Sequence, residues 1–246
     1  MSLRAAVIIP ARFGSTRFPG KVLALLGHVP VVEWCRRAAV RSGVGPVAVA
    51  TDDRRVKEAV EGFGGRAVLT SEDAPSGTDR VCEALRRLGW RPALAVNLQG
   101  DEPFVSPQAL RSLVAVLRRP GADLATLVTP LKSKARLMSP DVVKAAMAPD
   151  GRVLYFSRAP IPFCRSEEPS RWEHIGVYGF KASSLRRFVR LPPSALERAE
   201  SLEQLRAIED GMAVFAASVP ARGVAIDTPA DLAAAQRIIR SGGPGV

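Results

Sequence analysis

The chain has few of the residues that carry redox, metal and nucleophilic chemistry. Its 246 residues include two histidines and three cysteines, and aromatic side chains make up 6%. Cys35, Cys82 and Cys164 are far apart and form no CxxC pair, so the sequence indicates neither a zinc site nor a disulfide framework. We expect all three cysteines to pack in the core. His28 and His174 are isolated, which by itself is more typical of structural histidines.

Long apolar runs are absent as well. No stretch approaches the roughly 18 consecutive apolar residues that a membrane-spanning helix needs. The first apolar segment, Ala5–Pro10, has six residues, which is shorter than the apolar region of a secretory signal peptide. We therefore expect a cytoplasmic protein with no membrane partner.

Several catalytic motifs are missing too. The sequence contains no HExxH, GxSxG or GxGxxG, so it favours neither a metalloprotease, nor a hydrolase, nor a dinucleotide-binding protein. The stretch GSTRFPGKV is similar to a P-loop, but five residues separate Gly14 from Gly20, and Val22 stands where a P-loop has its hydroxyl. This spacing excludes a P-loop.

Positive charge exceeds negative charge, with 35 basic and 24 acidic residues and a net charge of +11. The basic residues are spread along the whole chain and form no block. A nucleic-acid-binding surface would gather its cations on one face or place aromatic rings between them. The composition favours a basic pocket for a small polyanion and no nucleic-acid partner. A nucleic-acid-binding module is the alternative from another class, and only the net charge supports it.

Strand-like and helix-like segments alternate in the first half of the chain. The expected strands are Ala5–Pro10, Val47–Thr51, Arg66–Leu69, Ala93–Leu98 and Asp123–Val128. The expected helices are about Val31–Ser42, Arg54–Phe63, Thr78–Leu88 and Pro107–Arg118. Nearly continuous apolar strands separated by helices predict an α/β fold, a Rossmann-like and mostly parallel sheet with helices on both faces.

The pattern changes after about residue 130. Val142–Met147 and Val153–Ser157 flank the turn Pro149-Asp150-Gly151, which predicts a hairpin and hence an antiparallel insertion. The remaining expected strands are His174–Lys181, Ala213–Val219 and Gly223–Asp227, and the remaining helices are Ala182–Arg190, Ser201–Asp210 and Pro229–Arg240. We expect a single domain. Its nucleotide-binding sheet comes from about residues 1–130 and 212–246, and its embedded α+β segment from about residues 131–211.

A basic loop follows the first strand in the stretch IIPARFGSTRFPGKVL. Its glycines allow backbone N–H groups to turn toward an anion. Arg12 and Arg17 offer forked donors, and Lys21 offers a compact charge, for the same polyanion. The alternative is a solvated basic turn.

Two acidic residues follow predicted strands. Asp101 comes after the strand in VNLQGDEP, and Asp227 after the apolar residues in VAIDTP. Ligands of open parallel sheets bind outside the carboxyl ends of the strands. A cationic loop and two carboxylates at that edge suit a triphosphate with Mg²⁺. A helix cap or turn is the alternative for each aspartate, and helix capping is the alternative for the stretch SGTDR at Ser76–Arg80.

Eight segments resemble the 3-deoxy-manno-octulosonate cytidylyltransferase (CMP-KDO synthetase) family nearly end to end. They are IPARFGSTRFPGK, VATDD, SGTDR, NLQGDEP, YFSRAPIPF, HIGVYGFK, SLEQLRAIEDG and IDTPADL. The resemblance implies transfer of CMP from CTP to 3-deoxy-D-manno-octulosonate (KDO), with pyrophosphate released, which activates KDO for lipopolysaccharide synthesis. It also implies Mg²⁺ as cofactor and a homodimer formed through the insertion.

The resemblance further implies roles for individual residues. The catalytic residues would be Arg12, Lys21, Asp101 and Asp227, of which Asp101 and Asp227 would bind the metal. The nucleotide would be bound by Arg12, Ser15, Arg17, Lys21, Ser76, Gly77 and Arg80. The sugar would be bound by Gln99, Arg158, His174, Tyr178, Glu203 and Gln204. The alternative within this class is a cytidylyltransferase for another ulosonic acid, such as a sialic acid or an amino-KDO. A further hypothesis, an inactive sugar-binding homologue, is disfavoured because all the expected charged positions are filled.

Overall fold

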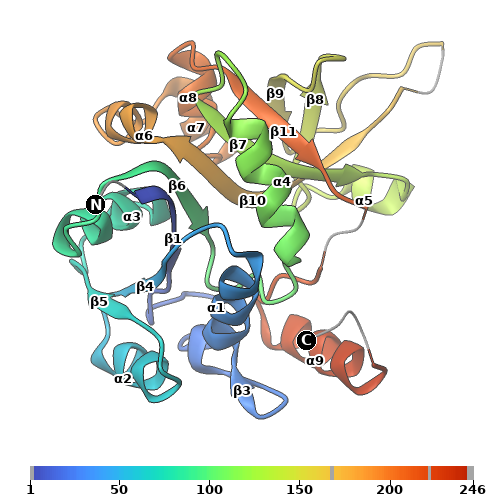
Figure 1. The fold of residues 1–246 in the computed structure, drawn as a ribbon. Helices are drawn as coiled ribbons and strands as arrows, with labels where there is room; N and C mark the ends of the chain where they lie inside the picture. The colour runs from blue at the N-terminus through green and yellow to red at the C-terminus, as the bar shows by residue number, and fades with distance from the viewer. Residues whose placement is uncertain (1–2, 167–168, 221–222, 243–246) are drawn as a thin grey trace. The chain divides into compact units, whose positions relative to one another are not determined.

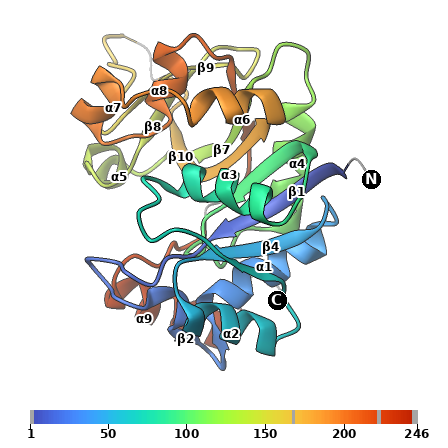
Figure 2. The ribbon, with the colours of Figure 1, turned by 90° about the vertical axis from the view of Figure 1, so that its left-hand side faces the viewer.

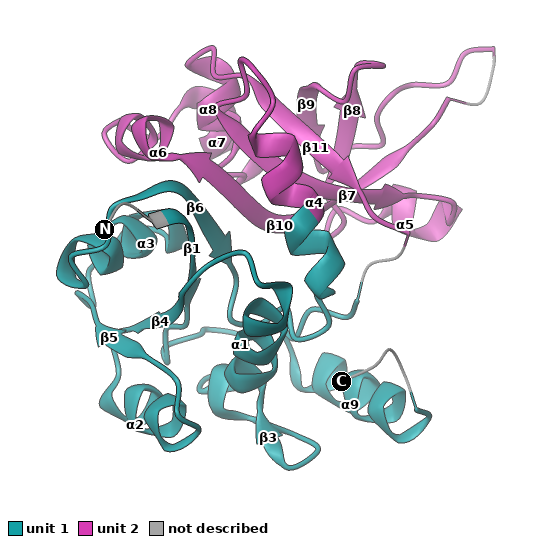
Figure 3. Ribbon diagram, viewed as in Figure 1, with its two compact units in different colours: residues 1–111, 223–246 teal, residues 112–222 magenta. Residues whose placement is uncertain are grey.

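The computed structural model describes residues 3–166, 169–220 and 223–242, whose helices and strands are labelled in Figure 1. The chain forms two compact units (Figure 3). Unit 1 comprises residues 1–111 and 223–246, and unit 2 comprises residues 112–222. Within the described residues, no helix is long and apolar enough to cross a membrane.

Unit 1 contains a parallel sheet with the strand order β6-β1-β4-β5. Its strands are β1 (Leu3–Pro10), β4 (Val47–Thr51), β5 (Ala67–Leu69) and β6 (Pro92–Leu98). Val7, Ile8 and Ile9 of β1 are fully buried, as expected for a parallel strand that is covered on both faces. The predicted α/β class is confirmed, and so are these strands, whose ends differ from the predicted ones by at most two residues.

Three helices of unit 1 follow its strands. They are α1 (Val31–Ser42), α2 (Arg54–Gly62) and α3 (Gly77–Arg87). Figure 2 shows α3 on one face of the sheet and α1 with α2 on the other. In α3, Val81, Ala84 and Leu85 recur at helical spacing and are buried, so this stripe of the helix faces the core. Each helix agrees with the predicted one to within one residue.

Strands β1, β4 and β6 run in the same direction, so the residues that follow them lie at one edge of the sheet. Residues 11–20 follow β1, Asp52 follows β4, and Asp101 comes after β6. The N–H of Gly100 donates to the backbone oxygen of Pro10 at 3.2 Å, and an added Cβ at Gly100 would lie 3.0 Å from that oxygen. Glycine permits this close approach, which brings Asp101 beside the start of the basic loop.

The segment Gly223–Asp227 is not the strand that we expected. Ile226 is fully buried, and its N–H donates to the backbone oxygen of Asp101 at 2.8 Å. Its side chain packs in a cluster whose other buried members are Leu26, Val31, Trp34 and Ala235. The prediction of a strand was wrong because the apolar residues before Asp227 serve as an anchor in this cluster.

Helix α9 (Pro229–Arg240) begins two residues after Asp227. Thr228 caps it, as predicted, with Pro229 at the first helical position. The Thr228 hydroxyl oxygen accepts from the N–H of Asp231 at 3.2 Å, and the Asp231 carboxylate accepts from the N–H of Thr228 at 2.8 Å. This capping box fixes the backbone directly after Asp227.

Short elements precede α1 in unit 1. They are η1 (Lys21–Leu23), a single turn of 3₁₀-helix, and the paired strands β2 (Leu25–Leu26) and β3 (Val29–Pro30). The indole N–H of Trp34 donates to the backbone oxygen of Leu26 at 2.9 Å. This bond ties the segment after the basic loop to α1.

Unit 2 contains a mixed sheet. Its strands are β7 (Leu124–Pro130), β8 (Lys144–Met147), β9 (Val153–Ser157), β10 (Trp172–Lys181) and β11 (Val214–Ser218). Strand β7 pairs antiparallel with β10 and parallel with β11, and β8 pairs antiparallel with both β9 and β10. The predicted hairpin is confirmed as β8 and β9. Strand β7, which we assigned to the nucleotide-binding sheet, belongs to unit 2.

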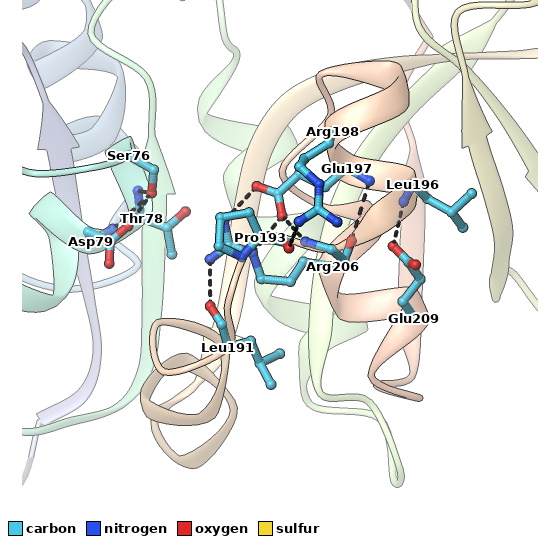
Figure 4. Close-up of polar contacts among 11 residues, drawn as sticks. Ser76, Thr78, Asp79, Leu191, Pro193, Leu196, Glu197, Arg198, Arg206 and Glu209 are labelled. Atoms are coloured by element: carbon cyan, nitrogen blue, oxygen red, sulfur yellow. Dashed lines mark hydrogen bonds and ion pairs between the residues drawn. The ribbon is translucent and has the colours of Figure 1, made fainter.

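The helices of unit 2 differ more from expectation. They are α5 (Lys134–Met138), α6 (Ala182–Phe188), α7 (Ala195–Glu200) and α8 (Leu205–Glu209), while α4 (Pro107–Leu117) begins in unit 1 and ends in unit 2. The expected helix Ser201–Asp210 is reduced to α8, because Ser201 adopts φ of 52° and ends α7. Neither α5 nor α7 was predicted. A capping box at Ser194 and Glu197 starts α7, and Arg206 of α8 donates to Glu197 at 2.5 and 2.8 Å (Figure 4).

The three cysteines are present as thiols. Cys35 is buried as expected, whereas Cys82 and Cys164 are half-buried, so the prediction of core packing is confirmed only for Cys35. Burial, followed by the charges of Asp101 and Glu102, raises the pKa of the Cys35 thiol well above its usual value. This thiol is therefore protonated at neutral pH and is a poor nucleophile.

Candidate functional site

A cavity of about 380 Å³ lies within unit 1 at the carboxyl edge of its sheet. Its walls are the end of β1 with the basic loop, the start of α3, the residues after β6, and Asp227. All seven residues predicted to bind nucleotide line it: Arg12, Ser15, Arg17, Lys21, Ser76, Gly77 and Arg80. Gln99, Asp101 and Asp227 line it as well. The structure therefore brings together every predicted site residue that belongs to unit 1.

Lys21 lies between the two aspartates. Its ammonium donates to Oδ2 of Asp101 at 2.5 Å and to Oδ1 of Asp227 at 2.8 Å. Burial lowers the pKa of Lys21, but the charges and hydrogen bonds of the two carboxylates outweigh it, so this pKa lies above its ordinary value. Arg17 adds a second cation 3.0 Å from Oδ1 of Asp227. The two acids thus lie close enough to share one cation.

The donor set at this point suits Mg²⁺. Asp101 and Asp227 supply carboxylate oxygens that already converge on a positive charge. In the part of the chain that the structure describes, no group of three or more His, Cys, Asp and Glu side chains converges on a metal position. A cation held by two carboxylates needs further oxygen ligands, which is how Mg²⁺ binds when it shares water and substrate phosphates with a protein.

Phe13 braces the basic loop. Its backbone oxygen accepts from the N–H of Gly20 at 3.0 Å, and its ring lies 3.0 Å from where a Cβ on Gly20 would stand. Gly20 has φ of 71°, a conformation that favours glycine. The guanidinium of Arg55 lies 3.7 Å from the centre of the Phe13 ring and covers it. The loop is therefore closed on itself at its two ends.

The two arginines of the loop differ in whether they form an ion pair. Arg12 forms no ion pair with any described residue, and Arg17 pairs with Asp227 although its side chain is mostly exposed. Ser15 accepts a hydrogen bond at Oγ from the N–H of Phe18 at 3.4 Å, so this hydroxyl can still donate. These groups face the cavity with unpaired donors, which a polyanion can occupy.

The start of α3 forms a second wall. The Ser76 hydroxyl accepts from the N–H groups of Thr78 and Asp79 at 3.2 Å each, and donates to the Asp79 carboxylate at 2.7 Å (Figure 4). The helix cap that we considered as an alternative for Ser76 is therefore present. Since a Cβ on Gly77 would come within 3.2 Å of Nε2 of Gln99, glycine keeps this wall open.

The amide of Gln99 is oriented by a buried chain of hydrogen bonds. Its Nε2 donates to Oδ1 of Asn97 at 3.0 Å, and Nδ2 of Asn97 donates to the Thr78 hydroxyl at 3.2 Å. The oxygen of the Gln99 amide is then the group that is left to accept a hydrogen bond in the cavity. Sequence reasoning missed Asn97, which alternates with apolar residues in β6 and is distinguished there only by being polar and buried.

The five other predicted sugar-binding residues belong to unit 2. His174 and Tyr178 lie on β10, whose pairing with β7 shifts register between Ile175 and Tyr178. Their rings lie 5.5 Å apart. The Tyr178 hydroxyl donates to Oε1 of Gln204 at 3.1 Å. Burial, together with the charge of Glu203, raises the pKa of the Tyr178 phenol far above its usual value, so this hydroxyl remains protonated.

Gln204 carries an orphan donor. It is buried, and with Oε1 bonded to Tyr178, its Nε2 has no hydrogen-bond partner among the described residues. A buried donor without a partner is costly and unusual in a folded protein. The arrangement fits a site in which a ligand oxygen accepts this bond.

Thr126 of β7 holds the ring of His174. The Thr126 hydroxyl is fully buried and lies 3.0 Å from the backbone oxygen of Val177, 3.3 Å from that of Ile175 and 2.9 Å from Nε2 of His174. A hydroxyl has one proton, and the carbonyls can only accept it. The arrangement that satisfies all three contacts has the Thr126 proton on a carbonyl and a protonated Nε2 of His174 that donates to the Thr126 oxygen.

Arg158 is engaged with the backbone. Its Nε donates to the backbone oxygen of Glu200 at 2.7 Å and its Nη1 to that of Pro140 at 2.8 Å. Its own N–H donates to the Glu200 carboxylate at 2.9 Å. These bonds tie β9 to the end of α7, so Arg158 has a structural role in unit 2 whatever else it binds.

Relatives cover nearly the whole chain. The family model described as "Cytidylyltransferase" matches residues 6–214. The 3-deoxy-manno-octulosonate cytidylyltransferase of Anaeromyxobacter dehalogenans (strain 2CP-C) is 48% identical over 240 residues, which are 96% of this chain and 98% of the relative. The protein of the same name from Xanthomonas campestris pv. campestris (strain 8004) is 44% identical over 248 residues, with 96% and 99% covered.

Solved structures agree with these relatives. CMP:2-keto-3-deoxy-manno-octonic acid synthetase complexed with CTP superposes with a TM-score of 0.93 at 38% identity, over 97% of this chain and 99% of that one. A nucleotidyl transferase from Methanothermobacter thermautotroptrophicus superposes with a TM-score of 0.64 at 19% identity, over 96% and 98% of the two chains. The second likeness concerns the fold alone.

Proposed function

Because the chain belongs to the 3-deoxy-manno-octulosonate cytidylyltransferase family, we propose that it transfers CMP from CTP to KDO. The anomeric hydroxyl oxygen of KDO attacks the α-phosphorus of CTP. The bond from this phosphorus to the oxygen that bridges it to the β-phosphate breaks, pyrophosphate leaves, and the hydroxyl proton is released. The product, CMP-KDO, supplies activated KDO for lipopolysaccharide synthesis. A step that consumes CTP belongs in the cytoplasm, where we propose the protein acts.

The observation that carries this proposal is the pair of aspartates that share one cation in a cavity lined by arginines. Arg12, Arg17 and Lys21 bind the phosphates and offset the charge that develops on the leaving pyrophosphate. Catalysis of this kind depends on positioning and charge stabilisation, and it needs no nucleophile from the protein. The absence of a nucleophile motif in the sequence agrees with this reaction.

Asp101 and Asp227 are the residues that would hold Mg²⁺. When bound, Mg²⁺ supplies positive charge to the phosphates and lowers the pKa of a coordinated hydroxyl. Before a metal binds, Lys21 keeps the two carboxylates together, because its ammonium offsets their mutual repulsion.

The start of α3 would bind the cytidine. Ser76 and Gly77 line the cavity, and so does Arg80, which is buried. Ser15 would donate to a phosphate from the basic loop. The amide oxygen of Gln99 would accept a hydrogen bond from a hydroxyl group of the sugar. This oxygen is available because Gln99 contacts Asn97 through its Nε2.

Residues of unit 2 would recognise the sugar acid. Gln204 would donate from its orphan Nε2, and the oxygen of Tyr178 would accept, since the Tyr178 proton is directed to Gln204. His174 and Glu203 would contact hydroxyl groups. A bond from Arg158 to the sugar carboxylate is also proposed. Nη1 and Nη2 of this guanidinium each have a second N–H that can donate while the bonds to backbone oxygens remain.

A homodimer formed through the insertion is part of this proposal. A cavity of about 960 Å³ in unit 2 is lined by residues from the segments 130–138, 160–164 and 169–172. Met138 and Phe163, which line it, are 61% and 87% exposed. Large apolar side chains at such exposure are typical of a contact surface. A second copy of this chain is the occupant that we propose. A monomer in sedimentation equilibrium at micromolar concentration would contradict it.

Pyrophosphate release tests the reaction. We expect release from CTP with Mg²⁺ only when KDO is supplied, and little with UTP, ATP or GTP. Another ulosonic acid, such as a sialic acid or an amino-KDO, that exceeds KDO in kcat/KM would replace the proposed sugar. Tight, salt-sensitive DNA binding without pyrophosphate release would favour the nucleic-acid-binding alternative instead.

A further inference from the structure

Asp52 joins two walls of the cavity without lining it. It follows β4 and is half-buried. Its Oδ1 accepts from the N–H of Phe13 in the basic loop at 3.1 Å. Its Oδ2 accepts from Nη2 of Arg80 in α3 at 3.1 Å. One carboxylate therefore contacts both the loop and the helix that enclose the cavity.

Arg80 is held on its other side as well. Its side chain is 4% exposed, and its Nη1 donates to the Thr70 hydroxyl at 2.6 Å and to the backbone oxygen of Ser71 at 3.1 Å. The Thr70 hydroxyl in turn donates to the backbone oxygen of Thr51, next to Asp52, at 3.1 Å. The guanidinium is thus fixed against the ends of β4 and β5, and Asp52 supplies its countercharge.

The bond from Phe13 to Asp52 holds the basic loop at the residue that closes it. Phe13 closes the loop onto Gly20, and Lys21 follows Gly20 directly. A carboxylate acceptor at the N–H of Phe13 sets where this brace lies relative to the end of β4. The position of Arg12, which precedes Phe13, depends on the same bond.

We propose that Asp52 is a positioning residue for nucleotide binding, which holds the basic loop and Arg80 at the spacing that a nucleoside triphosphate requires. This inference rests on the proposed function, because it takes the cavity to be the nucleotide site. Asp52 does not touch the nucleotide. It acts through Phe13 and Arg80.

The direction in which Asp52→Asn changes the affinity for CTP distinguishes a positioning role of Asp52 from an effect of its charge. Asp52 is an anion near a site for a polyanion, so its charge alone opposes CTP binding. Asp52→Asn removes that charge, and a pure charge effect would make CTP bind more tightly. A positioning role predicts the opposite, because the new amide NH₂ cannot accept from Arg80 and the spacing of the two walls relaxes.

Asp73→Asn is the matched control. Asp73 is exposed and precedes Ala74, which lines the cavity, but its carboxylate contacts neither the basic loop nor Arg80. This variant therefore reports what loss of a negative charge near the cavity does to CTP affinity, with the contacts of Asp52 in place. Asp52→Ala serves as a second variant, because it removes both acceptors, whereas Asn keeps one that can still serve Phe13.

The experiment is a titration of CTP into each folded variant by calorimetry, without KDO, with the melting temperature measured in parallel. We expect Asp52→Asn to weaken CTP binding about tenfold to a hundredfold, Asp52→Ala to weaken it at least as much, and Asp73→Asn to leave it equal or slightly tighter. The KM for KDO should stay the same in the Asp52→Asn variant.

Two failures are distinguishable. If the wild-type protein binds no CTP, the proposed function is wrong. If the wild-type protein binds CTP and Asp52→Asn binds it as tightly or more tightly, the positioning role is wrong, even if the melting temperature falls. If Asp52→Asn does not fold, hydrogen exchange of the Phe13 amide in the wild-type protein decides. Slow exchange that CTP slows further supports the proposal, and unprotected exchange in both states overturns it.

Discussion

The N–H of Ile226 donates to the backbone oxygen of Asp101 at 2.8 Å, although the two residues come from distant parts of the sequence. This bond holds Asp227, the next residue, beside Asp101. The buried side chain of Ile226 fixes the same segment from the other side, since it packs with Leu26 and Trp34. The proposed metal site therefore depends on an apolar anchor and one backbone hydrogen bond.

We predict that Ile226→Ala weakens both stability and catalysis. The substitution leaves a cavity in a closed cluster, so the free energy of unfolding should fall by about 2–5 kcal/mol. Turnover should fall as well, because Asp227 loses its support. Urea unfolding and pyrophosphate release measure the two effects. Val40→Ala is the control, since Val40 is half exposed on α1 and should change stability by less than about 0.5 kcal/mol. Normal turnover in the folded Ile226→Ala protein would contradict the anchoring role.

Asp101→Asn and Asp227→Asn should each lower turnover roughly hundredfold or more, because an amide is a poor ligand for Mg²⁺. The concentration of Mg²⁺ that gives half-maximal rate should rise in both variants. Steady-state kinetics over a range of Mg²⁺ concentrations measure this. Asp150→Asn, in the turn between β8 and β9, removes the same charge from unit 2 and should leave the rate unchanged. An unaltered Mg²⁺ dependence in either site variant would refute the metal assignment.

Lys21→Met should show its effect on stability in alkaline solution. The folded protein raises the pKa of Lys21 above its ordinary value of 10.5, so its ion pairs contribute stability fully below pH 10.5. That contribution is lost as the pH rises through the folded pKa. The difference in unfolding free energy between wild type and Lys21→Met should therefore be constant from about pH 7 to 10 and shrink above that range.

Urea unfolding at a series of pH values measures this difference. Lys57→Met is the control, because Lys57 pairs with Glu61 at the surface and contributes little at any pH. A difference that shrinks between pH 9 and pH 7 would be inconsistent with a raised pKa. In pyrophosphate release, Lys21→Met should act chiefly on kcat. A pure effect on the KM for KDO would contradict its role toward the triphosphate.

Thr126→Val should release the ring of His174. Valine has nearly the same shape but cannot accept from Nε2, so we expect the KM for KDO to rise about tenfold while the affinity for CTP stays unchanged. Nitrogen chemical shifts of His174 should show one tautomer with a protonated Nε2 in the wild type and a mixture in the variant. Thr129→Val, at another buried threonine of β7, is the control. A predominantly Nδ1-protonated ring in the wild type would overturn the assignment.

Much of the nucleotide cavity could be predicted because parallel strands end at one edge. The strand before Asp101 and the strand before the basic loop were recognisable as apolar runs, and their shared direction places their ends together. Asp227 was singled out for a reason that proved wrong, since no strand precedes it. What positions it is the burial of Ile226, and a single buried side chain leaves no periodic signal.

Other features needed the structure. The roles of Asp52, Asn97 and Thr126 depend on partners that are distant in sequence, and no local pattern encodes such pairs. Asp52 did carry a signal, because it directly follows a strand of the same parallel sheet as Asp101. Helix α7 carried one as well, since Ser194 and Glu197 have the spacing of a capping box.

The origin of Asp227 has a consequence for the newly synthesised chain. The first 111 residues contain the sheet, the basic loop and the start of α3, but Ile226 and Ala235, which complete the cluster around Trp34, emerge from the ribosome only after the whole of unit 2. A chain that is still being translated through unit 2 lacks one of the two acids and part of the cluster around Trp34. The proposed metal site therefore becomes complete only near the end of synthesis. A fragment that stops before residue 227 cannot form it.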